Sequence, residues 1–203
     1  MSKPRFITFE GIDGAGKTTQ IRAVTQTAAE KGIDFILTRE PGGTPAGEII
    51  RKTLLNEAMD PLTETLLFFA SRAELVQNVI RPALEAGRWV FCDRFTDATY
   101  AYQSGAKGIP AETVLTLEKT VLGDFKPDLT ILFDIAPEIA ATRLSKAREA
   151  DRFERESIDF FTRVRNAYLE RAKADPDRFF IIDSSRAPEV ITQELKEFLR
   201  SWL

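Results

Sequence analysis

The sequence predicts an α/β protein in which a five-stranded parallel sheet forms the middle layer of a three-layer α/β/α sandwich. Three observations predict it. Five short runs are nearly continuous in apolar residues, as expected of strands covered on both faces. Helix-length segments separate these runs, so that strand and helix alternate along the chain. The chain has 203 residues, 43% of them hydrophobic, which is enough for the core of one domain and short for two.

Each expected strand has an apolar interior and ends in a charged residue. Parallel strands bring their carboxyl ends to one edge of the sheet, where α/β proteins bind ligands. We expect strands at residues 5–10, 34–39, 89–93, 128–134 and 178–183.

The expected helices fill the intervals between the strands. Gly32, Gly87 and Gly123 directly follow three of them, as is typical of helix C-termini. We expect helices at residues 18–31, 46–56, 63–86, 111–122, 137–146, 157–174 and 188–203.

Composition excludes several classes of function. The formal net charge is −3, without the basic excess of a nucleic-acid-binding protein, so we expect no nucleic-acid partner. Cys92 is the only cysteine and there is no histidine, which excludes a disulfide framework within the chain and imidazole chemistry. Neither a signal peptide nor an apolar span is visible, so we expect a soluble, cytoplasmic protein without a membrane partner.

The first expected strand runs into residues 11–18, which match G-x-x-x-x-G-K-[ST] at every fixed position. We name this segment the phosphate loop. Its glycines let backbone N–H groups approach phosphate oxygens, and the following helix adds the positive end of its dipole. Lys17 is expected to reach the β- and γ-phosphates, and the Thr18 hydroxyl to coordinate Mg²⁺. The expected nucleotide-binding set is Gly11, Gly14, Ala15, Gly16, Lys17, Thr18 and Thr19.

A second motif follows the second strand, where Arg39 and Glu40 precede a turn formed by Pro41 and two glycines. Arginine suits a bidentate grip on a phosphate monoester, and Glu40 is a candidate Mg²⁺ ligand. Alternatively, this segment is an ordinary salt-bridged surface loop.

The third strand ends in Asp93 and Arg94, a carboxylate placed to hold Mg²⁺ beside a cation that neutralises phosphate. Asp134, at the end of the fourth strand, is a second candidate for the metal. Asp93 is preferred because Arg94 adjoins it.

Phe68 and Arg72 are four residues apart and so lie on one helical face, where a ring and a donor fork suit a nucleobase. In the alternative interpretation they are core and rim of a surface helix. The charged segment at about 145–156 is either a solvated face or a lid whose arginines close over phosphates.

In order and spacing, these motifs resemble those of bacterial thymidylate kinases, over nearly the whole chain. The Arg-Glu-Pro-Gly-Gly run that begins at Arg39 is far more specific than the phosphate loop. The resemblance implies a P-loop NTPase fold and transfer of the γ-phosphoryl group of ATP to dTMP, with Mg²⁺. It also implies a homodimer, with residues 63–86 as a candidate interface helix.

The resemblance further implies the roles of individual residues. Arg39 and Arg94 match residues that hold the dTMP phosphate, Phe68 the residue that stacks on thymine, and Arg72 the donor to thymine O4. The other matches are Asp13 for the deoxyribose 3′-hydroxyl, Tyr102 for the crowded 2′ position, Thr99 and Gln103 for the base and phosphate pocket, Arg143 for adenine, and residues 184–187 for the loop near that ring.

The phosphate loop has no basic residue at Gly14 or Ala15. In the family that the chain resembles, this feature goes with a catalytic arginine in the lid, so the resemblance implies Arg148 first and Arg152 second. Direct in-line transfer is the expected mechanism. Two alternatives remain open: a kinase of the same fold for a nucleoside or another monophosphate, and a nucleotide-dependent switch.

Overall fold

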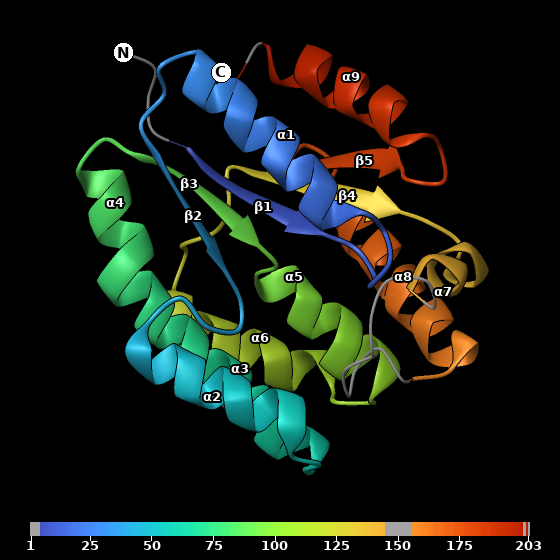
Figure 1. The fold of residues 1–203 in the computed structure, drawn as a ribbon. Coiled ribbons are helices and arrows are strands. Elements are labelled where there is room, and N and C mark those ends of the chain that lie inside the picture. The colour runs from blue at the N-terminus through green and yellow to red at the C-terminus, as the bar shows by residue number, and fades with distance from the viewer. Residues whose placement is uncertain (1–4, 145–155, 201, 203) are drawn as a thin grey trace.

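The computed structural model describes residues 5–144, 156–200 and 202, and confirms the expected α/β architecture. Its sheet has five parallel strands in the order β2-β3-β1-β4-β5 (Figure 1). The five predicted strand positions are correct to within one residue. The strands are β1 (Phe6–Glu10), β2 (Phe35–Arg39), β3 (Trp89–Asp93), β4 (Leu129–Asp134) and β5 (Phe179–Asp183).

The strand order decides where a ligand can bind. β1 lies between β3 and β4, so the chain crosses to opposite sides of β1 and leaves a crevice at the carboxyl edge. In the pairing register, Asp93 of β3 lies opposite Phe9 of β1 on one side and opposite Arg39 of β2 on the other. The phosphate loop and the segments after β2 and β3 therefore meet at one edge.

Helices cover both faces of the sheet. Figure 1 shows α1 (Lys17–Glu30) and α9 (Pro188–Leu199) on one side, and α5 (Thr96–Thr99) and α6 (Ala111–Leu122) on the other. The remaining helices are α2 (Pro45–Asn56), α3 (Pro61–Leu75), α4 (Arg81–Glu85), α7 (Pro137–Leu144) and α8 (Ile158–Ala174). Within the described residues no helix combines the length and the apolar content that crossing a bilayer requires.

The helix expected at 63–86 consists of three consecutive helical segments that continue one another without a break. A π-helical turn, η1 (Val76–Ile80), joins α3 to α4, and Pro82 lies just inside α4. Proline lacks a backbone donor and disturbs the regular hydrogen-bond ladder beside it, which a wider π turn accommodates.

A second π-helical segment, η2 (Tyr100–Ala106), continues α5 in a region where no helix was predicted. Tyrosine, serine and glycine make up four of its seven residues and have modest to low helix propensity. Packing against α8 holds the helix instead, because a Cβ at Gly105 would lie 2.5 Å from the Cβ of Ala167. Tertiary contact therefore overrides local propensity here.

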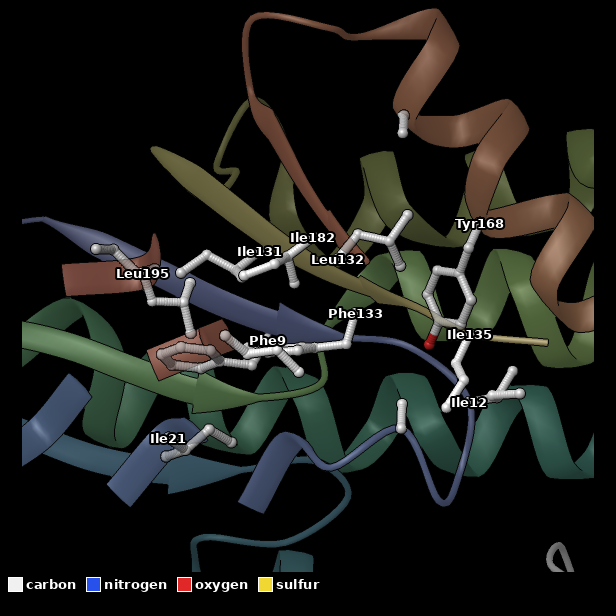
Figure 2. Close-up of a cluster of buried hydrophobic side chains, with 14 of the residues drawn as sticks. Phe9, Ile12, Ile21, Ile131, Leu132, Phe133, Ile135, Tyr168, Ile182 and Leu195 are labelled. Atoms are coloured by element: carbon white, nitrogen blue, oxygen red, sulfur yellow. The ribbon is translucent and has the colours of Figure 1, made fainter. Parts of the chain in front are cut away.

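The largest buried cluster spans the sheet and reaches its carboxyl edge. Figure 2 shows Phe9 and Phe133 from the strands packed beside Ile12 of the phosphate loop and Ile135 after β4. Tyr168 of α8 enters the same cluster and carries the hydroxyl oxygen visible in the figure. The residues below the crevice thus form a close-packed support, which limits movement of the loops above it.

Candidate active site

A cavity of about 500 Å³ opens at the carboxyl edge of the sheet. Most residues expected from the sequence to bind ligands line it: Asp13, Gly14, Gly16, Lys17, Thr18, Thr19, Arg39, Glu40, Phe68, Asp93, Arg94, Thr99, Tyr102, Gln103 and Arg143. Sequence reasoning missed five others: Pro41, Arg51, Leu55, Ala98 and Leu144. Among these, Arg51 donates to the Pro41 carbonyl at 2.9 Å and adds a cation to the cavity wall.

The phosphate loop has a conformation that depends on glycine. Gly11, Gly14 and Gly16 have φ of 137°, 81° and 83°. A Cβ at Gly14 would also lie 2.5 Å from the Ala140 carbonyl oxygen. α1 begins at Lys17 without a side-chain cap, so its first N–H groups face the cavity side and suit an anion.

Lys17 folds over this loop. Its ammonium donates to the carbonyls of Gly11 and Ile12, at 3.0 and 3.2 Å. Burial lowers the pKa of Lys17, as does the charge of Arg94, against the opposing effect of Asp13. An anion beside this ammonium would be favourable, because it would offset a charge that burial and Arg94 both disfavour.

Arg94 is the centre of a hydrogen-bonded cluster that reaches the phosphate loop at Asp13. One nitrogen, Nη2, donates to Asp13 at 2.7 Å and to the Tyr102 hydroxyl at 3.1 Å, and Nη1 donates to the Tyr168 hydroxyl at 3.1 Å. Tyr102 in turn donates to Asp13 at 3.0 Å. Burial alone would raise the pKa of the Asp13 carboxyl, but Arg94 and Lys17 lower it below its ordinary value.

Glu10 supports this cluster from beneath. It is fully buried and accepts hydrogen bonds from the Phe95 amide at 2.6 Å and the Tyr168 hydroxyl at 2.7 Å. Burial, with a smaller contribution from Asp97, raises the pKa of Glu10 to about 8. Tyr168 was not predicted as a site residue, because helical periodicity marks it only as core.

Arg72 and Glu40 form a buried ion pair that the sequence did not reveal. Nε and Nη2 of Arg72 donate to Glu40 at 2.6 to 3.2 Å, and Nη2 also donates to Thr99 at 3.0 Å. Arg72 Nη1 is buried without a partner among the described residues. Both Glu40 oxygens accept from Arg72, so in this structure Glu40 is engaged by an arginine, and its expected role as a Mg²⁺ ligand stays a prediction.

Arg39 lines the cavity but is paired with Glu48, to which Nη2 donates at 2.9 and 3.0 Å. Both side chains are close to half exposed. Exposed ion pairs contribute little to stability, on the order of 0 to 1 kcal/mol, so a phosphate can replace Glu48 at little cost.

Asp93 and Asp134, the alternative metal candidates, have different surroundings. Asp134 accepts a bidentate pair from Arg165 at 2.6 and 2.8 Å. Asp93 lines the cavity with Thr18, and its Oδ1 is buried without a partner in the described part of the chain. This geometry favours Asp93. No group of three or more Asp, Glu, Cys or His that could hold a metal occurs within the described ranges.

Arg143 links α7 to the loop after β5, donating to the carbonyls of Ser184 and Ser185 at 2.9 and 3.3 Å. The Ser184 hydroxyl donates to the Ala15 carbonyl and so joins the same loop to the phosphate loop. The expected lid, with Arg148 and Arg152, falls on residues 145–155, which lie outside the described residues.

A phosphate loop, a carboxylate at the end of β3 and arginines that line the same cavity define a P-loop protein that handles phosphorylated ligands. The family model described as thymidylate kinase matches residues 9–195. The chain therefore belongs to the thymidylate kinase family.

Individual relatives agree with this assignment. The chain is 50% identical over 198 residues to the thymidylate kinase of Methylobacillus flagellatus, covering 98% of each chain. It is 53% identical over 203 residues to that of Paraburkholderia phytofirmans, again covering 98% of each. The crystal structure of thymidylate kinase from Ehrlichia chaffeensis superposes with a TM-score of 0.80 at 33% identity, over 98% of this chain and 100% of that one.

Proposed function

We propose that the protein transfers the γ-phosphoryl group of ATP to dTMP, giving dTDP and ADP, with the two nucleotides end to end in the cavity. The observation that carries this arrangement is that Lys17, Arg94 and Arg39 line the same cavity. A protein that only hydrolyses ATP has no need for a second set of phosphate-binding arginines.

The donor half holds ATP. Backbone N–H groups of the phosphate loop and the first turn of α1 bind its phosphates, and Lys17 spans the β- and γ-phosphates. Arg143 packs near adenine beside residues 184–187. Thr18 and Asp93 hold the Mg²⁺ shell, which agrees with the partnerless Asp93 Oδ1. When bound, Mg²⁺ supplies charge neutralisation on the triphosphate.

The acceptor half holds dTMP. Arg39 and Arg94 bind its phosphate, Phe68 stacks on thymine, and Arg72 donates through Nη1 to thymine O4. Asp13 accepts from the 3′-hydroxyl, and Tyr102 closes the space at the 2′ position. Thr99 and Gln103 complete the pocket.

Chemistry here is positioning and charge neutralisation. A phosphate monoester is already largely dianionic near neutral pH, so its oxygen attacks without a strong general base. The arginines therefore align the acceptor in line with the leaving ADP and stabilise charge that develops on the transferred group. Arg148 or Arg152 adds to this charge from the lid.

We also propose a homodimer formed through α3. Leu62 and Leu66 are one helical turn apart and 44% and 47% exposed, which is unusual for two neighbouring leucines on a helix. Sedimentation analysis of the wild type against Leu66→Glu tests this: the charged variant should become monomeric.

A screen of acceptors tests the activity. Protein and Mg-ATP are incubated separately with dTMP, dCMP, dGMP, dAMP, thymidine or no acceptor, and ADP release is followed. We expect the largest rate with dTMP. Faster ADP release with thymidine would indicate a nucleoside kinase, and release without any acceptor would indicate a hydrolase or switch.

A further inference from the structure

An ion pair between Glu64 and Lys107 adjoins the cavity through Gln103, and neither of its two residues lines the cavity. Glu64 of α3 is fully buried, and Lys107 donates to its two oxygens at 2.8 and 2.9 Å. The same carboxylate accepts a hydrogen bond from Gln103 Nε2 at 2.8 Å. Of the three, only Gln103 lines the cavity.

We infer that Glu64 is a positioning residue for base selection: it fixes the amide of Gln103 so that Oε1, and not Nε2, is presented to the nucleobase. The inference rests on the proposed function and extends it to a residue that does not touch the ligand. Gln103 and Lys107 are four residues apart and thus reach Glu64 from one side of the η2 region.

The orientation follows from hydrogen-bond chemistry. A carboxylate paired with an ammonium can only accept, so Gln103 must turn its NH₂ group toward Glu64. The amide oxygen is then the atom left for the ligand. Reversing the amide would set two oxygens against each other in a buried site, which is strongly unfavourable.

This orientation selects one pattern of base edge. Thymine offers a hydrogen-bond donor at N3 next to the O4 acceptor, and cytosine offers an acceptor at N3 next to an amino donor. Gln103 Oε1 accepts from the first and repels the second. Arg72 does not line the cavity itself, but its buried, partnerless Nη1 is the donor proposed for O4. Glu40 orients Arg72 toward the O4 acceptor, and Glu64 orients Gln103 toward the N3 donor. Two buried carboxylates therefore select the thymine edge.

Glu64→Gln reverses the expected orientation with almost no change in shape. Its single amide oxygen is taken by Lys107, which can only donate, so the amide NH₂ faces Gln103. Gln103 then turns its oxygen toward residue 64 and its NH₂ toward the base. We expect the preference for dTMP over dCMP, measured as the ratio of kcat/KM, to fall about tenfold, the effect of one exchanged hydrogen bond.

Three measurements give this test its controls. Glu74→Gln makes the same change on the exposed surface of the same helix and should leave the ratio unchanged. Glu64→Asp keeps an acceptor and should keep the preference even if KM rises. In a Gln103→Leu background, Glu64→Gln should no longer change the ratio, because the residue acts through Gln103.

The kinetic constants separate positioning from general damage. Glu64→Gln weakens a base contact that is the same in the ground and transition states. Its loss should raise KM for dTMP several-fold and leave kcat within about twofold. An unchanged dTMP-to-dCMP ratio in Glu64→Gln, or an equal effect with and without Gln103, would overturn the inference. If the wild type did not use dTMP at all, the proposed function would fail instead, and the two failures are thus distinguishable.

Discussion

The guanidinium of Arg94 donates a 2.7 Å hydrogen bond to the Asp13 carboxylate, and it does so from a backbone φ of 70°. Arg94 is the one described residue other than glycine with a positive φ. Such a conformation costs about 1 kcal/mol or more, and is retained where it places a functional group. Here it turns the side chain over the end of β1 toward the phosphate loop.

Arg94→Ala tests the importance of this placement. We expect kcat to fall at least about a hundredfold, the effect typical of losing a preorganised donor to developing charge. The dissociation constant for ATP should change little, because Arg94 serves the acceptor side. Steady-state kinetics and calorimetric titration with a non-hydrolysable ATP analogue measure the two quantities, and an unchanged kcat would remove Arg94 from the mechanism.

Arg94→Gly provides a matched variant for the backbone. It should be as inactive as Arg94→Ala but more stable by about 1 kcal/mol, because glycine adopts positive φ without steric cost. Urea unfolding of the two variants measures the difference.

Lys17→Ala should abolish most activity and leave the fold intact. Lys17 is buried, its described partners are two backbone carbonyls, and its burial and the charge of Arg94 lower its pKa, so the fold holds this ammonium at a cost. The cation is therefore dispensable for folding and needed for charge on the donor phosphates. Circular dichroism beside an ADP-release assay tests both halves of the statement, and retention of more than a tenth of the activity would contradict it.

Asp93→Asn tests the metal site. The variant keeps the shape of the side chain and removes its charge, so we expect the Mg²⁺ concentration for half-maximal activity to rise about tenfold or more. Asp134→Asn is the control, because Asp134 is bonded to Arg165 and should not affect Mg²⁺ dependence. The opposite result would restore Asp134 as the metal carboxylate.

Glu10 predicts a pH dependence of stability. Burial raises the pKa of its carboxyl from the ordinary 4.5 to about 8, so between these values the folded protein binds a proton that the unfolded chain does not. The stabilisation that protonated Glu10 contributes is fully present below pH 4.5 and is lost as the pH rises through about 8.

Glu10→Gln removes that titration while preserving size. The free energy of unfolding of the wild type minus that of the variant should therefore decrease from about pH 4.5 to pH 8. Its slope can reach about 1.4 kcal/mol per pH unit, the value for one proton. Denaturant titrations over this range measure the difference, and a difference that grew with pH would show that Glu10 is ionised throughout.

Periodicity and local motifs predicted the features that depend on neighbours in the chain. The five strands and the phosphate loop are of this kind, since a continuous apolar run or a glycine pattern is visible within ten residues. The π-helical segment η2 was missed because its residues form a helix only against α8.

The electrostatic pairing of the site was also beyond the sequence. Glu40 and Arg72 are 32 positions apart and Glu10 and Tyr168 are 158 apart, so only the folded sheet brings them together. A carboxylate after a strand is typical of a metal ligand, which is why the sequence predicts that role for Glu40, and nothing local reveals its pairing with Arg72. The sequence places charged residues at the strand ends, but it does not show which distant residues they pair with, because the fold alone brings those residues together.

The most direct test of the central claim uses ATP labelled in its γ-phosphoryl group, with dTMP and Mg²⁺. A single cavity that aligns both nucleotides should pass the label to dTDP in equal amount to the ADP formed, with none released as inorganic phosphate. Label that appeared in inorganic phosphate, with dTMP left unphosphorylated, would contradict the account, because water and not the acceptor would then occupy the position opposite Lys17.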